Sequence, residues 1–281
     1  MSSKTPDWSA SQYLKFNNER TRPVYDLISQ TLPHLSSNPS PKIQDLGCGP
    51  GNSTSALLST FPDASITGLD SSPDMIREAR ATLPSVTFTI ADLSSYTAPP
   101  DADLLFSNAV FHWLRSSSRI PTLQTLFRNL KSGAVLAFQV PDNYHEQSHA
   151  LMRDTASLPG KSWTDSFAGT KIGDLQDATR PDLDPIEKPE AFIEAFTSEA
   201  TVVNVWRTTY FHVLQDAHAI VEWVRGTGLQ PFLHRMEDEK VRGEFLQEYE
   251  RRIAGAYGAL KDGTGRVVLG YPRLFVVAVR K

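Results

Sequence analysis

The sequence predicts an α/β protein built on a doubly wound, mostly parallel, seven-stranded sheet. Strand-like and helix-like segments alternate through the first half of the chain, as they do when parallel strands are joined by helices. A short strand-like run over 43–46 leads directly into a glycine-rich turn and then into a helical pattern. The segment 134–140 is almost continuously apolar, which is typical of a strand buried on both faces.

Each expected element rests on its own local pattern. Short runs of β-branched, aromatic or other apolar residues indicate strands. These runs cover 43–46, 65–69, 86–90, 102–106, 134–140, 202–211 and 273–279. Helical patterns cover 53–61, 73–83, 121–130, 217–225 and 238–257, with Pro73 in a first turn and Lys131-Ser132-Gly133 as a stop signal.

We expect a single domain over residues 1–281, with its core at about 23–145. The residues from about 157 to 190 are rich in Asp, Pro, Gly, Ser and Thr and show little periodicity, so they predict a long, variable surface excursion. The helical segments at about 214–260 predict a helical cap inserted before the last strand. The two last strands would form an antiparallel pair at the sheet edge.

Composition narrows the class of protein. The chain has 281 residues, of which 40% are hydrophobic, enough for a packed core. Lys+Arg number 28 and Asp+Glu 32, a net charge of −4, and no basic block suggests a nucleic-acid partner. No stretch approaches the roughly 20 apolar residues of a membrane span, and the N-terminus lacks the apolar run of a signal peptide. The lone Cys48 fits a reducing compartment, so we expect a cytoplasmic protein without a membrane partner. The oligomeric state is open, and a monomer is compatible with the sequence.

The glycine-rich turn is the strongest functional signal. Gly47, Gly49 and Gly51 remove the Cβ atoms that would keep a ligand away from the backbone, and the following helix adds free N–H groups. Nineteen residues beyond Gly51, Asp70 ends the next strand, where an acid suits the two hydroxyls of a ribose. The pattern predicts a site for a nucleotide-type cofactor.

The spacing bears on which cofactor binds. The dinucleotide pattern G-x-G-x-x-G would need a glycine at position 52, where Asn52 stands. Asp45 precedes the first glycine by two residues and suits a ligand that carries a cation, such as the ammonium of an amino-acid moiety. Both observations argue against a nicotinamide-dependent oxidoreductase, which we keep as the less favoured alternative.

Further polar residues follow the other strands. Asp92, between Ala91 and Leu93, can accept a hydrogen bond from an adenine amino group. Asn108 ends the strand that begins near 102 and can contact the cofactor through its amide or backbone. The neighbouring His112 and Trp113 can wall the cleft, although Trp113 suits a core position equally well.

The run Asp45-Leu46-Gly47-Cys48-Gly49-Pro50-Gly51 resembles the first motif of class I S-adenosylmethionine-dependent methyltransferases. Narrower motifs resemble the trans-aconitate 2-methyltransferase family nearly from end to end. They comprise Trp8, Tyr13-Leu14, Phe16, Glu19-Arg20, Arg22-Pro23, residues 45–54, Gly68-Leu69-Asp70-Ser71-Ser72-Pro73, Pro141-Asp142-Asn143, Trp206-Arg207-Thr208-Thr209-Tyr210, Thr227-Gly228-Leu229 and Tyr271-Pro272-Arg273-Leu274-Phe275. The segment 157–189 departs from the family pattern.

The resemblance implies a Rossmann-like class I methyltransferase fold, with S-adenosylmethionine as cofactor. It also implies a carboxyl O-methyltransferase that forms the monomethyl ester of trans-aconitate or a closely related unsaturated di- or tricarboxylic acid. Another small acid, fumarate-like or an acylated amino acid, is the alternative acceptor. The expected cofactor-binding residues are Arg22, Asp45, Gly47, Cys48, Gly49, Asn52, Asp70, Ser71, Met75, Ala91, Asp92, Leu93, Asn108 and Ala109. The expected substrate-binding residues are Tyr13, Arg20, His112, Trp113, Tyr144, Arg207, Tyr271 and Arg273.

A carboxylic acid acceptor suits the lack of a recognisable catalytic set. A carboxylate has a pKa of about 4 and is ionised at neutral pH, so methyl transfer needs positioning rather than a general base. We therefore expect no catalytic residue in the strict sense. His145 and His149 lie four apart on an expected helix but have no third ligand, so we expect no metal. Bidentate arginines suit a polyanionic acceptor, and the candidates are Arg20, Arg22, Arg153, Arg207 and Arg273.

Overall fold

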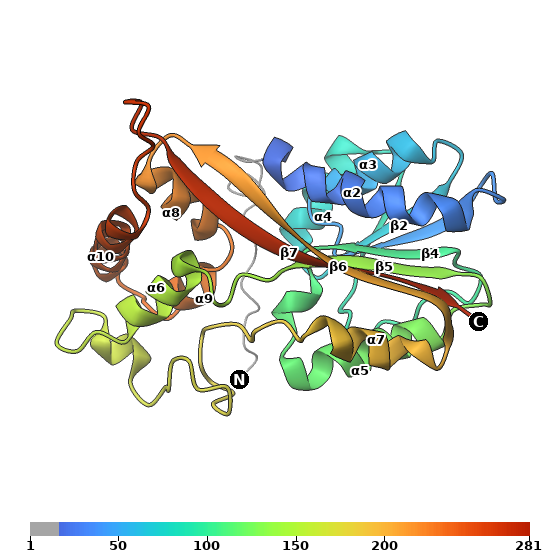
Figure 1. Cartoon of the computed structure of the whole chain (residues 1–281). Helices are drawn as coiled ribbons and strands as arrows, with labels where there is room; N and C mark the ends of the chain where they lie inside the picture. The colour runs from blue at the N-terminus through green and yellow to red at the C-terminus, as the bar shows by residue number, and fades with distance from the viewer. Residues whose placement is uncertain (1–16) are drawn as a thin grey trace. The chain divides into compact units, whose positions relative to one another are not determined.

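A computed structural model describes residues 17–281, with side chains from Thr21 onward (Figure 1). Seven strands form one sheet in the order β3-β2-β1-β4-β5-β7-β6. The strands are β1 (Lys42–Leu46), β2 (Ser65–Asp70), β3 (Thr87–Ile90), β4 (Leu104–Asn108), β5 (Val135–Pro141), β6 (Ala200–Leu214) and β7 (Val267–Arg280). Strands β1 to β5 pair in parallel, and β7 runs antiparallel to β5. The predicted doubly wound, mostly parallel sheet is confirmed.

The strand order places the predicted site residues at one edge of the sheet. The chain runs outward from β1 to β2 and β3, and then returns to β4 on the other side of β1. This reversal is the topological switch point at which open α/β sheets bind ligands. In the registers, Asp45 lies opposite Gly68, Asp70 opposite Ile90 and Asn108 opposite Gln139. The carboxyl ends of β1 to β5 therefore share this edge.

Helices cover both faces of the sheet. Figure 1 shows α2 and α3 on one face and α5 and α7 on the other. The described helices are α2 (Asn17–Leu35), α3 (Asn52–Thr60), α4 (Pro73–Thr82), α5 (Ser116–Arg128), α6 (Gln147–Ala156), α7 (Pro189–Thr197), α8 (Ala217–Arg225), α9 (Gln230–Leu233) and α10 (Glu239–Ala256), with the 3₁₀ turns η1 (Phe111–Trp113) and η2 (Thr164–Phe167). Sequence patterns located α3, α4, α8 and α10 closely. Helix α6 begins at Gln147, within the helix expected to carry His145 and His149, whereas α2, α7 and α9 were not predicted.

The predictions were wrong at two helices on the same face of the sheet, α5 and α7 (Figure 1). Helix α5 begins at Ser116 rather than Pro121, which lies inside the helix. Helix α7 begins at the end of the expected excursion and finishes before the expected strand at 202–211, in a stretch where no helix was predicted. Its Phe196 and Phe192 lie one turn apart and pack edge-to-face on Phe127 and Phe138, with ring centroids 5.1 and 5.7 Å apart. This aromatic cluster fixes α7 against the sheet.

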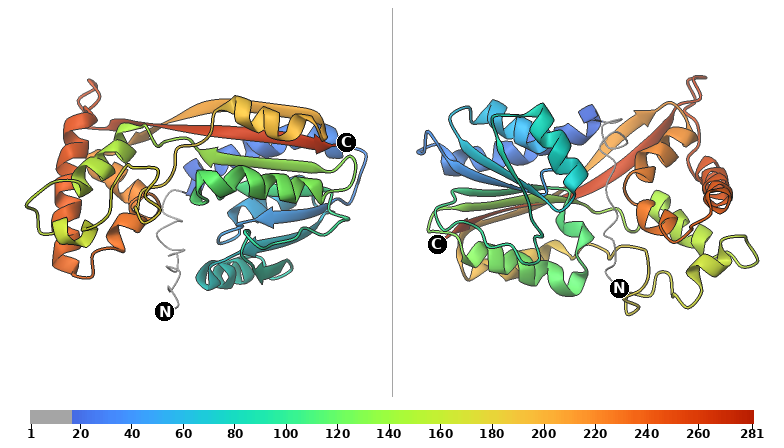
Figure 2. Two further views of the ribbon diagram at one scale, coloured as in Figure 1. Left: turned by 90° about the horizontal axis from the view of Figure 1, so that it is seen from below. Right: turned by 180° about the vertical axis from the view of Figure 1, so that it is seen from behind.

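The chain divides into two compact units. The first comprises residues 1–141, 186–208 and 273–281 and holds most of the sheet, and the second comprises 142–185 and 209–272. Within the second unit, α6, α8 and α10 lie side by side in both views of Figure 2. Tyr249 of α10 donates to the carbonyl of Ser148 over 2.8 Å, and Tyr257 accepts from the Ser148 N–H over 3.1 Å. The helices expected before the last strand are present, and their role as a cap stays a prediction.

The segment after α6 differs from the predicted surface excursion. Trp163 and Phe167 are buried, and both rings pack against Phe245 of α10. Arg180 is also buried and forms ion pairs with the buried Asp182 and Asp184.

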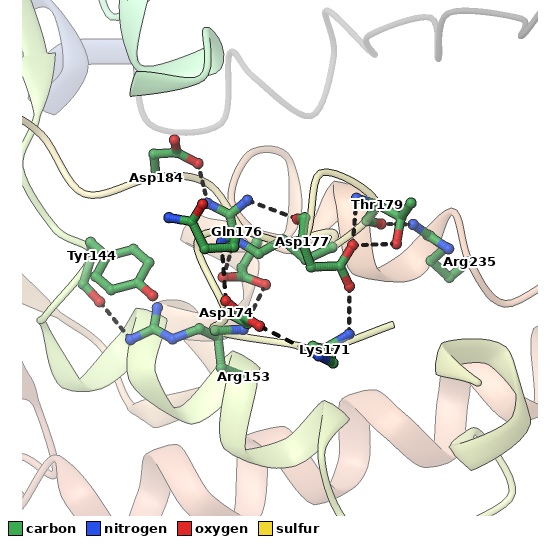
Figure 3. A network of polar contacts seen from close by, with 12 residues as sticks. Tyr144, Arg153, Lys171, Asp174, Gln176, Asp177, Thr179, Asp184 and Arg235 are labelled. Carbon is green, nitrogen blue, oxygen red and sulfur yellow. Dashed lines mark hydrogen bonds and ion pairs between the residues drawn. The ribbon is translucent and has the colours of Figure 1, made fainter. Parts of the chain in front are cut away.

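Figure 3 shows the surrounding network, in which Asp177 accepts from the Lys171 N–H over 2.6 Å and from the Thr179 hydroxyl over 2.7 Å. Paired charges and short turns hold this segment. Because they have no helical or strand period, the sequence pattern gave no sign of burial.

Within residues 17–281, no helix has both the length and the apolar character that crossing a membrane requires.

The buried Arg119 holds the loop after β4. Its Nε donates to the carbonyl of Phe111 over 3.0 Å, and Nη2 donates to that of Leu114 over 2.9 Å. Its Nη1 pairs with Glu187, just before α7, at 2.5 Å. Both carbonyls flank His112 and Trp113, so this arginine sets the course of the turn that carries them.

We expect Arg119→Met to lower the free energy of unfolding by about 3–5 kcal/mol, because it strands Glu187 and two buried carbonyls. Arg128→Met on the same helix is the matched control. Arg128 is 56% exposed and pairs with Glu199 at 2.8 Å, so its loss should cost less than about 1 kcal/mol. Denaturant titration of both variants measures the difference. Equal effects would contradict the structural role of Arg119.

Candidate functional site

The buried carboxylate of Asp45 lies at the end of β1, directly before the glycine-rich turn. Its side chain is 0% exposed. Oδ2 accepts hydrogen bonds from Ser53 Oγ at 2.7 Å and Thr54 Oγ1 at 2.6 Å, both in the first turn of α3. Oδ1 is equally buried, and no hydrogen-bond donor reaches it in the described part of the chain, whose side chains begin at Thr21. Burial raises the pKa of Asp45 to about 6, although the two hydroxyls act in the opposite direction.

An anionic oxygen that is buried and unsatisfied is costly unless a ligand completes it. A cationic group of a ligand would both satisfy Oδ1 and lower the pKa of Asp45. The chemistry of this donor set therefore fits the ammonium of an amino-acid moiety.

The glycine-rich turn adopts a backbone that only glycine takes easily. Gly47 has φ +71°, and a Cβ there would lie 2.2 Å from Val110 Cγ2, which is a severe clash. Gly49 has φ +55°, and apart from its two chain neighbours a Cβ there would meet no atom of the described residues within 4 Å. The space beside Gly49 is therefore open to a ligand. Burial raises the pKa of the Cys48 thiol, which stays protonated at neutral pH and fills the turn.

Helix α3 begins at Asn52, one residue before the predicted start at 53. The N-cap position is Gly51, with φ +99° and no side-chain cap, and Asn52 is the first helical residue. The hydroxyls of Ser53 and Thr54 bond to Asp45 instead of capping the helix. Asp45 therefore holds the start of α3 against the end of β1.

Asp70 ends β2 and connects the turn to the next helix. Its Oδ2 accepts from the Gly49 N–H at 2.9 Å, and its Oδ1 accepts from the Ser72 N–H at 2.9 Å. Ser72 caps α4 by accepting from the Met75 N–H at 3.3 Å, which buries Met75, while Ser71 is exposed.

The end of β3 lies beside the end of β2. The Ala91 N–H donates to the Asp70 carbonyl at 3.0 Å, which fixes the loop that carries Asp92 and Leu93. The Asp92 side chain is exposed and accepts from the Ser94 N–H at 2.8 Å. The structure thus brings Asp70 and the Asp92 loop together at the carboxyl edge, as the sequence predicted.

The end of β4 lies on the other side of β1. Ser107 donates to the Leu46 carbonyl at 2.9 Å and ties the two strand ends together. Ala109 has φ +59°, the left-handed region that non-glycine residues rarely adopt. Such strain concentrates at functional sites, where the surrounding contacts maintain it. Asn108 is half-buried directly before this strained residue.

His112 and Trp113 lie on η1, just beyond Ala109. Their rings are 4.8 Å apart, His112 is buried and Trp113 is half-buried. Neither belongs to a cluster of three metal-ligating side chains, and no such cluster is found among residues 17–281.

The arginines predicted to bind the acid differ in how deeply they are buried. Arg273 is 5% exposed at the sheet edge and donates from Nη1 to Gln139 Oε1 at 2.9 Å. Arg207 is exposed on β6, next to Trp206, whose ring stacks on Phe275 at 4.8 Å. Arg22 is exposed on α2.

Other predicted residues lie in the second unit or outside the described residues. Arg153 lies over the Tyr144 ring at 3.8 Å and donates to the Tyr144 carbonyl at 2.9 Å. The Tyr271 ring packs against Trp223 and His149. Tyr13 lies outside the described residues, and so does the side chain of Arg20. Substrate binding by these residues stays a prediction.

Sequence reasoning missed three groups that shape this edge. They are the hydroxyls of Ser53 and Thr54, the buried Arg119, and Gln139 within β5. Gln139 carried a readable signal, since it is the one polar residue in the apolar run 134–140. Arg119 carried none, because its partners are two main-chain carbonyls and a glutamate 68 residues away. Ser53 and Thr54 lie only eight and nine residues from Asp45, but a pattern of residue types does not show that their hydroxyls bond to it.

Comparisons with known proteins point to one class. A family model described as a methyltransferase domain matches residues 43–133. Trans-aconitate 2-methyltransferase of Rhodopseudomonas palustris strain HaA2 is 43% identical over 98% of this chain and 99% of its own. The proteins of the same name from Agrobacterium fabrum and Methylobacterium nodulans are 44% and 45% identical, each over 98% of this chain and at least 98% of its own.

Solved structures agree on the fold. The YcgJ protein of Bacillus subtilis superposes with a TM-score of 0.52 at 11% identity, over 90% of this chain and 98% of its own. Coclaurine N-methyltransferase bound to N-methylheliamine and S-adenosylhomocysteine superposes with a TM-score of 0.50 at 12% identity. The match covers 92% of this chain and 72% of that structure's chain.

The fold and the site at its carboxyl edge define a class I methyltransferase that uses S-adenosylmethionine. Relatives at 42–45% identity over nearly the whole chain narrow the assignment further. The chain belongs to the trans-aconitate 2-methyltransferase family.

Asp45→Asn should separate stability from binding. The folded pKa of Asp45 lies above the unfolded value, so the cofactor-free wild type loses stability as pH rises from 3.8 to about 6. The asparagine does not ionise, so the variant keeps this stability, and at pH 7.5 its free energy of unfolding should exceed that of the cofactor-free wild type by about 1–3 kcal/mol. It should also bind S-adenosylmethionine about ten- to a hundredfold more weakly, since the ammonium loses a charged partner.

Denaturant titration and calorimetry measure the two effects. Wild-type affinity should fall below pH 6, where Asp45 takes up a proton in the free protein. Asp101→Asn, at an exposed carboxylate paired with Lys42, is the control and should move neither quantity appreciably. Wild-type cofactor affinity in folded Asp45→Asn would show that Asp45 does not hold the ammonium.

Proposed function

We propose that this chain is a carboxyl O-methyltransferase that transfers the methyl group of S-adenosylmethionine to trans-aconitate and forms its monomethyl ester. The observation that carries the proposal is the identity of 42–45%, nearly end to end, with relatives named trans-aconitate 2-methyltransferase. A closely related unsaturated di- or tricarboxylic acid is the near alternative, followed by a fumarate-like acid or an acylated amino acid.

The edge of the sheet supplies suitable partners for each part of the cofactor. Asp45 Oδ1 would take the ammonium, and the open space beside Gly49 would admit the ligand close to the backbone. Asp70 would accept the ribose hydroxyls, and Asp92 the adenine amino group. When bound, the cofactor supplies an electrophilic methyl carbon on its sulfonium.

Arginines would hold the acid acceptor. Arg273 is buried, so a carboxylate that pairs with it is largely removed from water, and the planar guanidinium can bind both oxygens. Arg207 is exposed, and water weakens any pairing there. We therefore assign the dominant role to Arg273.

The chemistry requires orientation more than proton transfer. The attacking carboxylate is already ionised at neutral pH, so no protein group needs to remove a proton. The residues of this chain would align a carboxylate oxygen with the methyl carbon and exclude water, a contribution that can amount to several kcal/mol.

We place this activity in the cytoplasm, because the single cysteine, Cys48, is a free thiol and suits a reducing compartment.

Transfer of a radiolabelled methyl group to a panel of small acids tests the proposal. The panel contains trans-aconitate, cis-aconitate, fumarate, citrate and an acylated amino acid. We expect the highest kcat/KM with trans-aconitate and a base-labile labelled product, as a methyl ester must be. Label in none of these acids would contradict the proposed function.

His112→Gln tests the absence of a general base. If the carboxylate attacks unaided, the single-turnover rate with both ligands bound should remain within about tenfold of wild type and stay flat between pH 6.5 and 8.5. A loss of several orders of magnitude in that rate, with both ligands still bound, would assign His112 a catalytic role.

Arg273→Lys should raise the acceptor KM more than Arg207→Lys does. Losing a bidentate partner of a desolvated carboxylate costs about 2–5 kcal/mol, and losing one at an exposed position costs far less. Cofactor affinity should stay within about twofold in both variants. Arg266→Lys, an exposed arginine paired with Asp262, is the control. An unchanged kcat/KM for the acid in Arg273→Lys would remove Arg273 from the acid site.

A further inference from the structure

Gln139 is a fully buried polar residue in a strand of otherwise apolar side chains. It lies in β5 between Phe138 and Val140, and its exposed fraction is 0%. Burying an amide is unfavourable unless its donor and acceptor are both satisfied. Gln139 satisfies both, and its partners lie on the two neighbouring strands.

The strand registers bring these partners together. Asn108 of β4 lies directly opposite Gln139 in the parallel pair. In the antiparallel pair, Gln139 lies opposite Phe275 of β7. Arg273 is two residues before Phe275, so its side chain lies on the same face of β7 as that of Phe275. Arg273 Nη1 donates to Gln139 Oε1 at 2.9 Å, and Gln139 Nε2 donates to Asn108 Oδ1. A single hydrogen-bonded chain thus crosses three strands at the carboxyl edge.

The charge of Arg273 fixes the direction of both hydrogen bonds made by the Gln139 side chain. A guanidinium only donates, so the oxygen of Gln139 must face Arg273 and its NH₂ must face Asn108. The Asn108 oxygen is then used as an acceptor, and only its NH₂ remains for another partner. Among the side chains from Thr21 onward and the described backbone, the Asn108 side chain makes no further hydrogen bond.

The backbone of Gln139 supports the same residue from a second side. Its carbonyl accepts from the Ala109 N–H at 2.9 Å, where the backbone takes its left-handed turn at φ +59°. Side-chain and main-chain bonds of Gln139 therefore both determine where Asn108 stands.

We propose that Gln139 is a positioning residue for methyl transfer, which orients the Asn108 amide so that its NH₂ donates to a carboxylate ligand. The inference rests on the proposed function. Two carboxylates are available, one on the acid acceptor and one on the amino-acid moiety of the cofactor. The direction of the amide matters because an inverted Asn108 would present an oxygen and repel either carboxylate.

Gln139→Glu and Gln139→Met test the proposal, with kcat, acceptor KM and cofactor Kd measured for each. The glutamate keeps an acceptor for Arg273 and forms an ion pair with it, but it cannot donate to Asn108. Asn108 would then invert and donate its NH₂ to the new carboxylate. We therefore expect the acceptor KM or the cofactor Kd of Gln139→Glu to rise about ten- to a hundredfold, at least as much as in Gln139→Met.

The affected constant identifies the carboxylate. A rise in acceptor KM with an unchanged cofactor Kd assigns Asn108 to the acid, and a rise in cofactor Kd assigns it to the cofactor. Gln44→Met is the matched control, since Gln44 is a buried glutamine of β1 that accepts from the Tyr96 hydroxyl at 3.1 Å. It should change stability without changing either constant.

Two outcomes would overturn the proposal. One is wild-type kinetics in Gln139→Glu, because a structural glutamine would tolerate a glutamate that pairs with Arg273. The other is a change in Gln139→Met no larger than in Gln44→Met. Wild-type protein assayed in parallel separates this test from the proposed function, since failure of the wild type to methylate any acid contradicts that function instead.

Discussion

The structure depends on one unfavourable burial, that of the Asp45 carboxylate at the junction of β1 and α3. Two hydroxyls hold one oxygen, and the other oxygen has no donor among residues 17–281. A well-packed apolar residue would make this junction more stable. Its free energy cost is understandable if a cation completes the site. The same carboxylate holds the first turn of α3 in place, so the group proposed to bind the ligand also fixes the position of the helix N-terminus.

The remaining polar residues of the edge follow from the strand order. Because β2 and β4 flank β1, Asp70 and Asn108 approach Asp45 from opposite sides, and each is fixed by bonds to a neighbouring strand or turn. Gln139 extends this arrangement to β7 and Arg273. Polar groups that are buried and fully bonded become rigid. Rigid positioning of the reacting groups is what the proposed in-line methyl transfer would require of the protein.

Much of this arrangement was predictable from the sequence, and the reason is local. The glycine-rich turn, Asp45 and Asp70 are signals that depend on residues close together in the chain, and the strand ends follow from periodicity. The contacts that were missed leave no periodic pattern of residue types in the sequence. Arg119 bonds to main-chain carbonyls and to Glu187, and Arg180 pairs within a segment that has no period. A pattern of side-chain types cannot show a contact whose partner is a carbonyl or lies 68 residues away.

The polar edge also links ligand binding to stability. In the free protein, the buried Asp45 and the strained Ala109 both raise the free energy of the folded state. A ligand that binds only the folded chain stabilises it by RT ln(1 + [L]/Kd), about 2.7 kcal/mol at a hundredfold excess over Kd. The cost at Asp45 is an electrostatic cost, so a cation removes it and a neutral ligand of the same shape does not. On the proposed function, Asp45 would therefore select a ligand group by its positive charge, and the guanidinium of Arg273, across the sheet on β7, would select one by its negative charge.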